Sequence, residues 1–156
     1  AAATPEQIYP YIKSISYPNN KARNLAGMAR MLCSEFGGEV PSDLQQMQRL
    51  PGVGRKSANL IRGDIFHLPA VVADTHCIRM ANRIGFVTDT TDPVQVERAL
   101  VKVLPPEESN DFCHRCVMHG RVVCTARKAL CEVCCLQDVC RTGKKTIKQE
   151  TLEELV

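Results

Sequence analysis

The 156-residue sequence predicts an all-α protein. Its apolar residues recur at spacings of three and four, which is the spacing of one buried helix face, and convincing alternating strands are absent. Pro and Gly residues stand where such helices would begin and end. The short apolar segment Pro69–Ala73 is expected to link two of these helices.

The first long helix is expected between Asn20 and Phe36. Its apolar residues would form one buried face, and Gly37-Gly38 would end it. Ser42 and Gln45 have the spacing of a capping box, which predicts that a short helix opens there. The residues of the predicted buried face are Ala22, Leu25, Ala29, Leu32, Cys33 and Phe36.

Two further helices are expected in the second half of the chain. Asp92-Pro93 has the residue types of an N-cap and a first helical position, so a helix should run from there to about Leu104. Pro105-Pro106 would end it, and the next helix should cover Glu107–Val117. From about Thr142 onward the chain is polar and charged, which indicates a tail or a last exposed helix.

The composition is that of an ordinary globular domain, with 44% hydrophobic residues, 24% charged residues and a formal net charge of +3. This mildly basic balance permits a polyanionic partner without requiring one. No apolar run is long enough to span a bilayer and the first residues lack a signal pattern, so we expect a cytoplasmic protein without a membrane partner. The nine cysteines would then be reduced, and their short spacings favour metal ligation over disulfides.

A glycine-rich turn at Leu50–Ser57 is the first candidate binding element. Gly52 and Gly54 permit a tight turn, and a helix follows at once. The amide hydrogens of the turn and of the new helix N-terminus can bind a phosphate, with Arg55 adjacent. Val53, between the glycines, is expected to pack into the core. A plain interhelical turn is the alternative, and the flanking Pro and Arg-Lys favour phosphate binding over it.

Lys56 and Asp74 are the candidate catalytic residues. Lys56 lies in the first turn of the helix after the hairpin, where the positive end of the helix and Arg55 disfavour an ammonium group. From position alone, a solvated lysine that contacts phosphate is the simpler interpretation. Asp74 is a preferred N-cap for a helix through Ala81, and capping would fix the direction of its carboxylate. His76 is expected to have a supporting role at most.

Four cysteines near the C-terminus have the spacing C-x6-C-x2-C-x5-C, which suits a metal cluster. A zinc ribbon made of two C-x2-C pairs, Cys113/Cys116 and Cys131/Cys134, is the alternative. The first pair lies in an apolar pattern typical of a helix face, so we expect it, together with Cys33 and Cys77, to be core residues. Cys135, beside a candidate ligand, is ambiguous. The four candidate ligands are Cys124, Cys131, Cys134 and Cys140.

The ordered set of motifs resembles endonuclease III, a family of DNA glycosylases with AP lyase activity in the helix–hairpin–helix glycosylase superfamily. The order and separations match from about Thr4 to Cys140, and the set is far more specific than any single motif. Lysine at position 56 separates the chain from the adenine-mismatch glycosylase branch, which lacks that nucleophile. The matching motifs are Leu50-Pro51-Gly52-Val53-Gly54-Arg55-Lys56, Asp74-Thr75-His76, His119-Gly120-Arg121 and the four cysteines.

The resemblance implies a helix–hairpin–helix glycosylase fold, with a partial helical barrel lobe and an iron–sulfur cluster lobe. Lys56 would attack the sugar C1′ of a flipped-out oxidised pyrimidine nucleotide, displace the base and form a Schiff base, from which β-elimination cuts the strand. Asp74 would stabilise the developing positive charge and help to deprotonate Lys56. The implied DNA contacts are Gly52, Val53, Gly54, Arg55, Arg127 and Lys128, and the implied ligands of a [4Fe–4S] cluster are Cys124, Cys131, Cys134 and Cys140.

The resemblance also implies how the chain is organised. Residues 4–104 would form a helical lobe with the helix–hairpin–helix at about 44–64, residues 105–140 a helix and the cluster loop, and residues 141–156 a polar tail. Relatives begin with further helices before the region matching Thr4, so the chain is expected to be N-terminally truncated. A monomer is expected for the full-length family, and this shorter chain could need a complementing chain.

The expected partner is double-stranded DNA that contains oxidised pyrimidines or abasic sites, in association with the nucleoid. Two other functions stay open. One is a DNA-binding module that has lost catalysis, and the other is a zinc-ribbon nucleic-acid binder.

Overall fold

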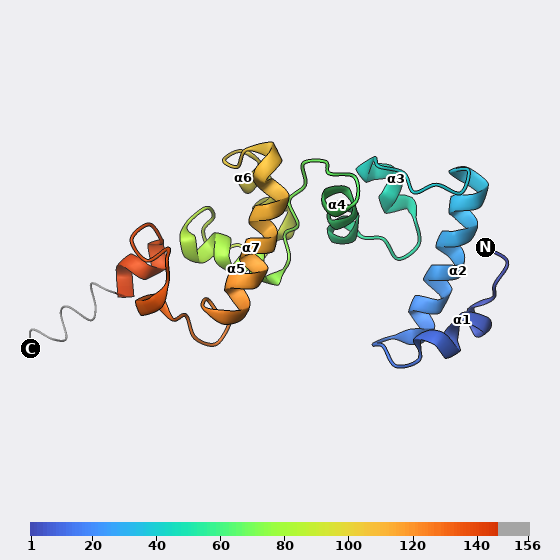
Figure 1. Ribbon diagram of the computed structural model, residues 1–156, viewed down its shortest axis with the longest axis horizontal. Helices are drawn as coiled ribbons and strands as arrows, with labels where there is room; N and C mark the ends of the chain where they lie inside the picture. Colours follow the sequence, from blue (N-terminus) through green and yellow to red (C-terminus); the bar gives the residue numbers. More distant parts are fainter. Residues whose placement is uncertain (147–156) are drawn as a thin grey trace, which may run out of the picture. The chain divides into compact units, whose positions relative to one another are not determined.

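The computed structural model describes residues 1–146, which form helices and connecting segments without a β-strand. One isolated antiparallel bridge joins Cys124 and Ala129. The predicted all-α class is confirmed. In chain order the elements are α1 (Pro5–Ile12), α2 (Pro18–Glu35), α3 (Leu44–Arg49), α4 (Arg55–Asp64), α5 (Thr75–Ile84), α6 (Pro93–Val101), the short 3-10 helix η1 (Pro106–Glu108), α7 (Ser109–Val122) and the 3-10 helix η2 (Cys131–Val133) (Figure 1).

The chain divides into two compact units. The first, Ala1–Phe66, holds α1 to α4, and the second, His67–Val156, holds the remaining elements. The predicted lobe boundaries at residues 104 and 140 remain predictions. Of the predicted tail, residues 141–146 are helical, and residues 147–156 lie outside the described residues.

In the first unit, α1 packs on α2, and α3 packs on α4. Helix α1 begins with a capping box, in which Thr4 Oγ1 accepts the Gln7 N–H and the Thr4 N–H donates to the Gln7 side chain. Helix α2 ends before Gly37-Gly38, and the Gly38 N–H donates to the Leu32 carbonyl at 2.8 Å. The predicted stop at the two glycines is therefore confirmed.

The buried face of α2 differs from the predicted one. Ala22 and Ala26 are buried, whereas Leu25 and Cys33 are exposed. Steps of three and four along this helix leave two overlapping apolar faces available, and the face used is the one with small alanines, which lets neighbouring backbones approach closely. The prediction that Cys33 is a core residue was wrong.

Helix α3 also begins differently from its prediction. Its N-cap is Asp43, whose Oδ1 accepts the Gln46 N–H at 2.9 Å. Ser42 instead offers its backbone carbonyl to Arg62 Nε, at 3.2 Å. Both Ser and Asp are favoured N-caps, so the residue types alone could not separate them.

In the second unit, one hydrophobic core joins α5, α6 and α7. The predicted N-caps Asp74 and Asp92 are confirmed, and Asp92 Oδ1 accepts the Val94 N–H at 2.9 Å. Helix α6 ends at Val101, before the predicted Leu104, while α7 continues past Val117. The buried core residues are Val71, Val72, Cys77, Met80, Ala81, Val96, Leu100, Cys113 and Cys116.

A segment without regular secondary structure, residues 67–74, precedes α5, and we call it the strap. Its backbone N–H groups at Ala70 and Val72 have side-chain acceptors on α7, namely Ser109 Oγ at 3.1 Å and Cys113 Sγ at 3.2 Å. A buried amide left without an acceptor would cost about 1–3 kcal/mol. Helix α7 therefore makes it possible for the centre of the strap, residues 70–72, to lie buried without a sheet partner.

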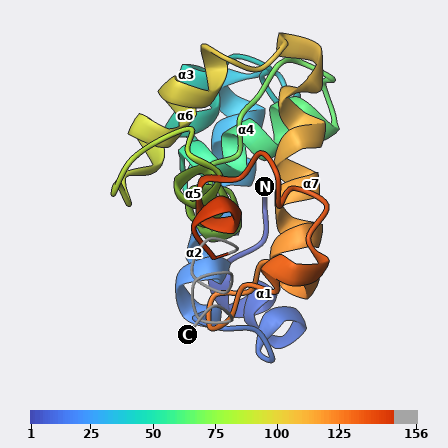
Figure 2. The same cartoon turned by 90° about the vertical axis from the view of Figure 1, so that its left-hand side faces the viewer.

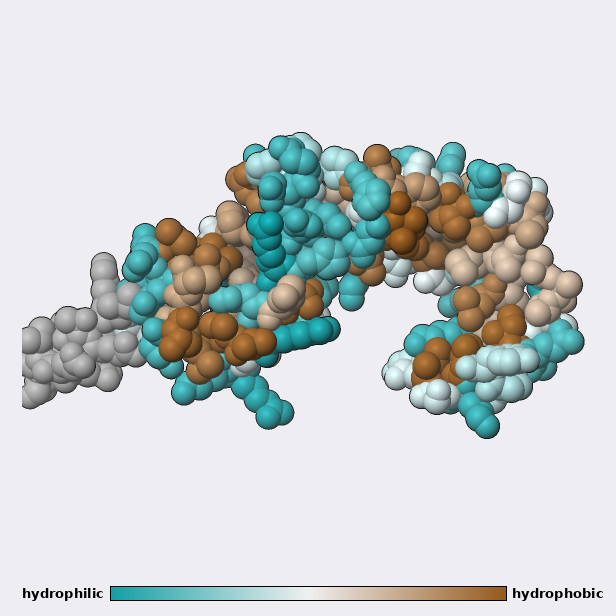
Figure 3. All heavy atoms as spheres, viewed as in Figure 1, coloured by the Kyte–Doolittle hydropathy of each residue, from teal (hydrophilic) through white to brown (hydrophobic). Residues whose placement is uncertain are grey.

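Apolar side chains also reach the surface of both units (Figure 3). Tyr11 and Tyr17 in the first unit, and Met118 and Val122 on α7, are each at least 70% exposed. Among residues 1–146, no helix combines the length and the apolar character needed to cross a membrane.

Candidate functional site

A tight turn at Leu50–Val53 joins α3 to α4. The Val53 N–H donates to the Leu50 carbonyl at 3.0 Å and Gly52 has a φ of +80°, which are features of a type II turn with Pro51 at its second position. Leu50 is buried, whereas Val53 is only half-buried. The expected core packing of Val53 is thus met in part, and Leu50 is the deeper anchor of the turn.

Helix α2 packs closely against this turn. A Cβ atom placed on Gly52 would lie 2.9 Å from both Cβ and Nδ2 of Asn24. A Cβ atom on Gly27 would lie 3.2 Å from Cγ of Pro51. Helix α2 therefore packs against the turn so closely that there is no room for a methyl group at Gly52.

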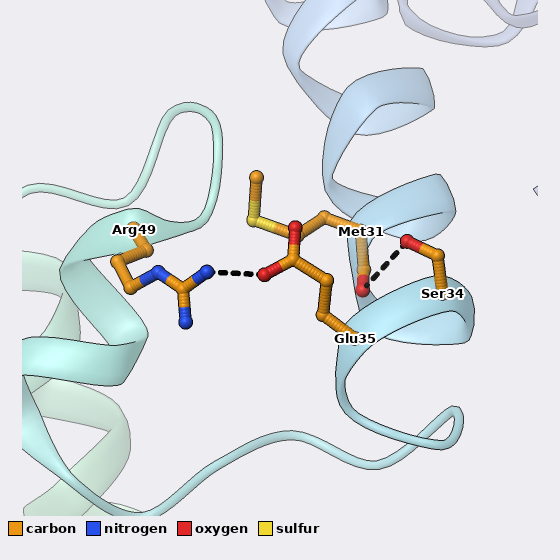
Figure 4. A network of polar contacts seen from close by, with 4 residues as sticks. All are labelled: Met31, Ser34, Glu35 and Arg49. Atoms are coloured by element: carbon orange, nitrogen blue, oxygen red, sulfur yellow. Dashed lines mark hydrogen bonds and ion pairs between the residues drawn. The ribbon is translucent and has the colours of Figure 1, made fainter.

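Two basic residues near the turn bind other parts of the first unit. Arg49, the last residue of α3, pairs with Glu35 at the end of α2 (Figure 4), and its guanidinium lies 5.5 Å from the centre of the Phe36 ring. Arg62 donates to the Ser42 carbonyl. Both arginines thus contact other segments of the first unit, and Arg49 and Lys56 are both exposed.

Helix α4 starts directly after the turn. Its N-cap is Gly54, so no capping side chain covers the first amide hydrogens of the helix. A Cβ atom on Gly54 would have no atom within 4 Å in the described structure. Arg55 is half-buried and Lys56 is exposed, both in the first turn. The positive end of this helix and an exposed amine are thus placed together, which is an arrangement that can bind an anion.

Asp74 lies at the start of α5, in the second unit. Its Oδ1 accepts the Cys77 N–H at 2.8 Å, and its own N–H donates to the Val72 carbonyl at 2.8 Å. Asp74 is half-buried. The strap and the helix therefore orient the carboxylate while it keeps access to solvent. The catalytic roles expected of Lys56 and Asp74 remain predictions.

Three cysteines lie together in the core next to Asp74. Cys77 on α5 and Cys113 and Cys116 on α7 are at most 3% exposed. A hydrogen bond from Cys113 lowers the pKa of Cys77, but its hydrogen bond to Cys116 and its burial outweigh this effect and raise the pKa to about 12. The pKa of Cys113 is also raised, first by its hydrogen bond to Cys77 and then by burial. The prediction that these three are core residues is confirmed.

The four cysteines predicted as ligands line one pocket of the second unit. The wall is completed by Arg83 of α5 and by Ala129, Leu130, Gln137, Thr142 and Gly143. Burial raises the pKa of Cys134, and the neighbouring thiols add to this effect. Cys135 is exposed and does not line the pocket. The four lining cysteines are Cys124, Cys131, Cys134 and Cys140.

The pocket brings four thiols of one short segment together. A [4Fe–4S] cluster takes four thiolates, one on each of its four irons, so this donor set fits a cluster. Within residues 1–146, no three Cys, His, Asp or Glu side chains are placed to hold a single metal ion.

The zinc-ribbon alternative meets a difficulty at its first C-x2-C pair. Cys113 and Cys116 belong to the core that α7 forms with α5 and α6. Cys113 also accepts the Val72 N–H in the strap. Both thiols are thus engaged in packing, away from the pocket that Cys131 and Cys134 line.

The loop between Cys124 and Cys131 carries two of the predicted contact residues. The Lys128 N–H donates to Thr125 Oγ1 at 3.1 Å, and the Thr125 hydroxyl donates to the Lys128 carbonyl at 2.7 Å. These bonds close a tight turn at whose tip Arg127 and Lys128 are exposed.

Two arginines of α5 that the sequence pattern did not reveal hold this loop. Arg79 donates to the carbonyls of Cys124 at 3.2 Å and Gly120 at 2.9 Å. Arg83 donates to the carbonyl of Thr125 at 2.7 Å. The segment after α7 thereby turns back onto α5 (Figure 2). The available signal was their spacing, because residues four apart lie on the same face of a helix.

The far end of the cysteine segment is tied to the same helix. Arg141 Nη2 donates to the carbonyls of Asn82 at 2.7 Å and Val87 at 3.1 Å. The Thr142 hydroxyl donates to the Arg83 carbonyl at 3.0 Å. Both ends of the segment that contains the four cysteines are therefore fixed to α5 and to the turn that follows it.

Comparison with known proteins gives consistent matches over most of the chain. The family model described as HhH-GPD superfamily base excision DNA repair protein matches residues 1–106. A protein named endonuclease III from Bacillus subtilis (strain 168) is 37% identical over 144 residues, which are 92% of this chain and 66% of the relative. Endonuclease III of Escherichia coli (strain K12) is 40% identical over 140 residues, 90% of this chain and 66% of the relative. The chain thus spans just under two thirds of the length of these curated relatives.

A solved structure of a trapped endonuclease III–DNA covalent intermediate has a TM-score of 0.85 to this chain. The sequence identity is 39%, and the match covers 94% of this chain and 68% of that one. The predicted helix–hairpin–helix glycosylase fold is confirmed.

Proposed function

The chain belongs to the HhH-GPD superfamily of base excision DNA repair proteins, and on this basis we propose that it is a DNA glycosylase with AP lyase activity. Its substrates would be oxidised pyrimidines and abasic sites in double-stranded DNA. The observation that carries the proposal is Lys56, an exposed amine in the uncapped first turn of α4, directly after the glycine turn. The solved relative trapped as a covalent intermediate with DNA supports a mechanism that passes through a covalent bond.

The hairpin would bind the DNA backbone. The first amides of α4 carry no capping side chain, and the space around Gly54 is open, so a phosphate oxygen could approach the backbone closely. Arg55 and the half-buried Val53 would support this contact. Such binding does not depend on base sequence, so it supplies affinity and register rather than lesion recognition.

Lys56 would act as the nucleophile. Its neutral amine attacks C1′ of a nucleotide rotated out of the helix, the bond from C1′ to the base breaks, and the base leaves with the electron pair. Ring opening of the sugar then gives an imine between C1′ and Lys56 Nζ. Loss of a proton from C2′ expels the 3′ phosphate, and hydrolysis of the imine frees the lysine.

Asp74 would support this step as a carboxylate. Bonds to Cys77 and Val72 fix its orientation at the start of α5. A negative charge held near the sugar stabilises the positive charge that develops as the base departs, and it can accept the proton of the attacking amine. The structural bonds that hold Asp74 would therefore also serve catalysis.

A [4Fe–4S] cluster held by the four pocket cysteines would have an organising role. It would join the two ends of the loop from Thr125 to Leu130, which already bonds to Arg83. The loop would then present Arg127 and Lys128 to DNA phosphates. These contacts would make DNA binding strongly dependent on salt concentration.

Borohydride trapping on DNA with an abasic site tests the proposal directly, because borohydride reduces an imine to a permanent link. We expect adduct from the wild type and from Lys21→Ala, a matched control in which another exposed lysine near a helix start is removed. Lys56→Ala should give no adduct above background. Binding without any adduct from the wild type would favour the non-catalytic DNA-binding module, and equal trapping by Lys56→Ala would exclude Lys56 as the nucleophile.

Two further measurements test the substrate and the cofactor. A duplex with a ring-saturated pyrimidine should be cleaved, whereas one with an oxidised purine should not. Iron and sulfide analysis of the purified chain should find the cluster, and Cys134→Ser should lose iron while Cys135→Ser retains it. A colourless, zinc-loaded protein would refute the cluster.

A further inference from the structure

We propose that Cys113 is a positioning residue for Asp74: its buried thiol accepts the Val72 N–H and so fixes the segment that delivers the Asp74 carboxylate. The inference rests on the proposed role of Asp74 and assigns a task to a cysteine outside the predicted ligand set.

The distance between alternate amides of the strap is close to the distance between their acceptors on α7. Ala70 and Val72 are two residues apart in an extended segment, which corresponds to about 6.6 Å along the chain. Their acceptors, Ser109 and Cys113, are four residues apart on a helix, a rise of about 6 Å. Alternate strap amides therefore meet successive turns of α7, at 3.1 Å and 3.2 Å. Two bonds of this kind define the register of the strap along the helix.

Cys113 acts on one of the two residues that orient Asp74. The Asp74 N–H donates to the Val72 carbonyl, and Asp74 Oδ1 accepts the Cys77 N–H, both at 2.8 Å. Cys113 accepts the Val72 N–H. A shift of Cys113 would therefore reach the carboxylate through the backbone of Val72, a route that Cys116 does not share.

Cys116 offers a matched control. It lies one turn further along α7, it is 2% exposed against 3% for Cys113, and it belongs to the same core. It bonds to the Cys77 thiol, but the two strap amides have Ser109 and Cys113 as their acceptors. Alanine at either position removes the same atoms from the core, and only alanine at 113 removes an acceptor from the strap.

Single-turnover base removal at saturating enzyme tests the proposal. We expect Cys113→Ala to lower the rate constant roughly ten- to hundredfold, as displaced catalytic groups do, with the Kd for lesion DNA changed less than twofold. Cys113→Ser restores an acceptor and should recover most of the rate, and Cys116→Ala should keep the wild-type rate. Equal losses in Cys113→Ala and Cys116→Ala would overturn the proposal, because packing alone would then explain both.

Amide hydrogen exchange gives a second readout that does not depend on activity or on the folding of Cys113→Ala. The Val72 amide should exchange slowly in the wild type and in Cys113→Ser. Exchange as fast as that of an exposed amide in the wild type would overturn the proposal. A wild type without adduct or base removal contradicts the proposed function, whereas an active wild type with equally slow alanine variants contradicts the role of Cys113 alone.

Discussion

Gly52→Ala should destabilise the first unit because both the backbone and the surroundings of Gly52 exclude a side chain. Gly52 has a φ of +80°, and a Cβ there would lie 2.9 Å from Cβ of Asn24. The left-handed backbone costs an alanine about 1–2 kcal/mol, and the overlap with α2 adds about 1–3 kcal/mol. The less flexible unfolded chain offsets about 0.4–1 kcal/mol. These ranges combine to roughly 1–5 kcal/mol, and we expect the free energy of unfolding to fall by about 3 kcal/mol, near the middle of that range.

Thermal unfolding followed by circular dichroism at 222 nm measures this loss, which corresponds to a Tm lower by roughly 5–10 °C for a chain of this length. Gly54→Ala is the matched control, because Gly54 has a φ of −86° and open space around it. Its change in stability should stay within about 1 kcal/mol, the size of an N-cap effect. Equal melting temperatures for Gly52→Ala and Gly54→Ala would refute the reasoning.

A double-mutant cycle separates the clash from the backbone strain. Asn24→Gly removes the Cβ atom that the methyl group introduced by Gly52→Ala would meet, and glycine costs roughly a few tenths of a kcal/mol more than asparagine in a helix. In the Gly52→Ala background the same change should cost less or even stabilise, with a coupling energy of about 1 kcal/mol or more. A coupling near zero would assign the whole loss to the backbone.

Three further predictions concern the second unit. The pKa of Cys77, raised from its ordinary 9.0 to about 12, means that the unfolded chain loses its thiol proton first. The protonated Cys77 thiol therefore contributes its full stability below pH 9, and this contribution is lost as the pH rises towards 12. The urea midpoint of unfolding should fall over this pH range, and it should fall less in Cys77→Ala. Gly120→Ala places a Cβ 2.8 Å from Arg79 Nη2 and should speed proteolysis of the 125–130 loop; unchanged cleavage would mean that Arg79 does not restrain it. Neutralising Arg127 and Lys128 should weaken binding to damaged and intact duplexes alike and reduce the salt slope by about two, measured by fluorescence anisotropy; an unchanged slope would remove the pair from the interface.

Two helix starts were predictable because a favoured capping residue stands before each helix, whereas at α3 the neighbouring Ser42 and Asp43 are both favoured and Asp43 is the cap. Asp74 and Asp92 bond to amides within three residues, so the local sequence contains the whole interaction. The buried face of α2 was not predictable to the same degree, since its apolar residues fit two overlapping faces. The neighbours that choose between Ala26 and Leu25 lie on other helices, which periodicity within α2 cannot reveal.

The hydrogen bonds that fix the cysteine segment to α5 could not be predicted from the sequence, for a different reason. Arg79, Arg83 and Arg141 bond to backbone carbonyls that lie more than forty residues away along the chain. Every residue has a carbonyl, so the sequence carries no mark of the acceptor. The cysteine spacing, by contrast, identified four residues that line one pocket, because close spacing limits how far apart they can lie. The functions of Lys56 and Asp74 stay predictions until trapping tests them.

The pairing of the strap with α7 limits how the length of this segment can change during evolution. Most connections between helices tolerate insertions and deletions, because their backbone groups bond to water. Val71 and Val72 are both buried, so one added or lost residue before Asp74 would move these side chains out of their places in the core. It would also move both amides off Ser109 and Cys113. We therefore expect homologous chains to vary in composition between His67 and Asp74 but to keep the number of residues constant.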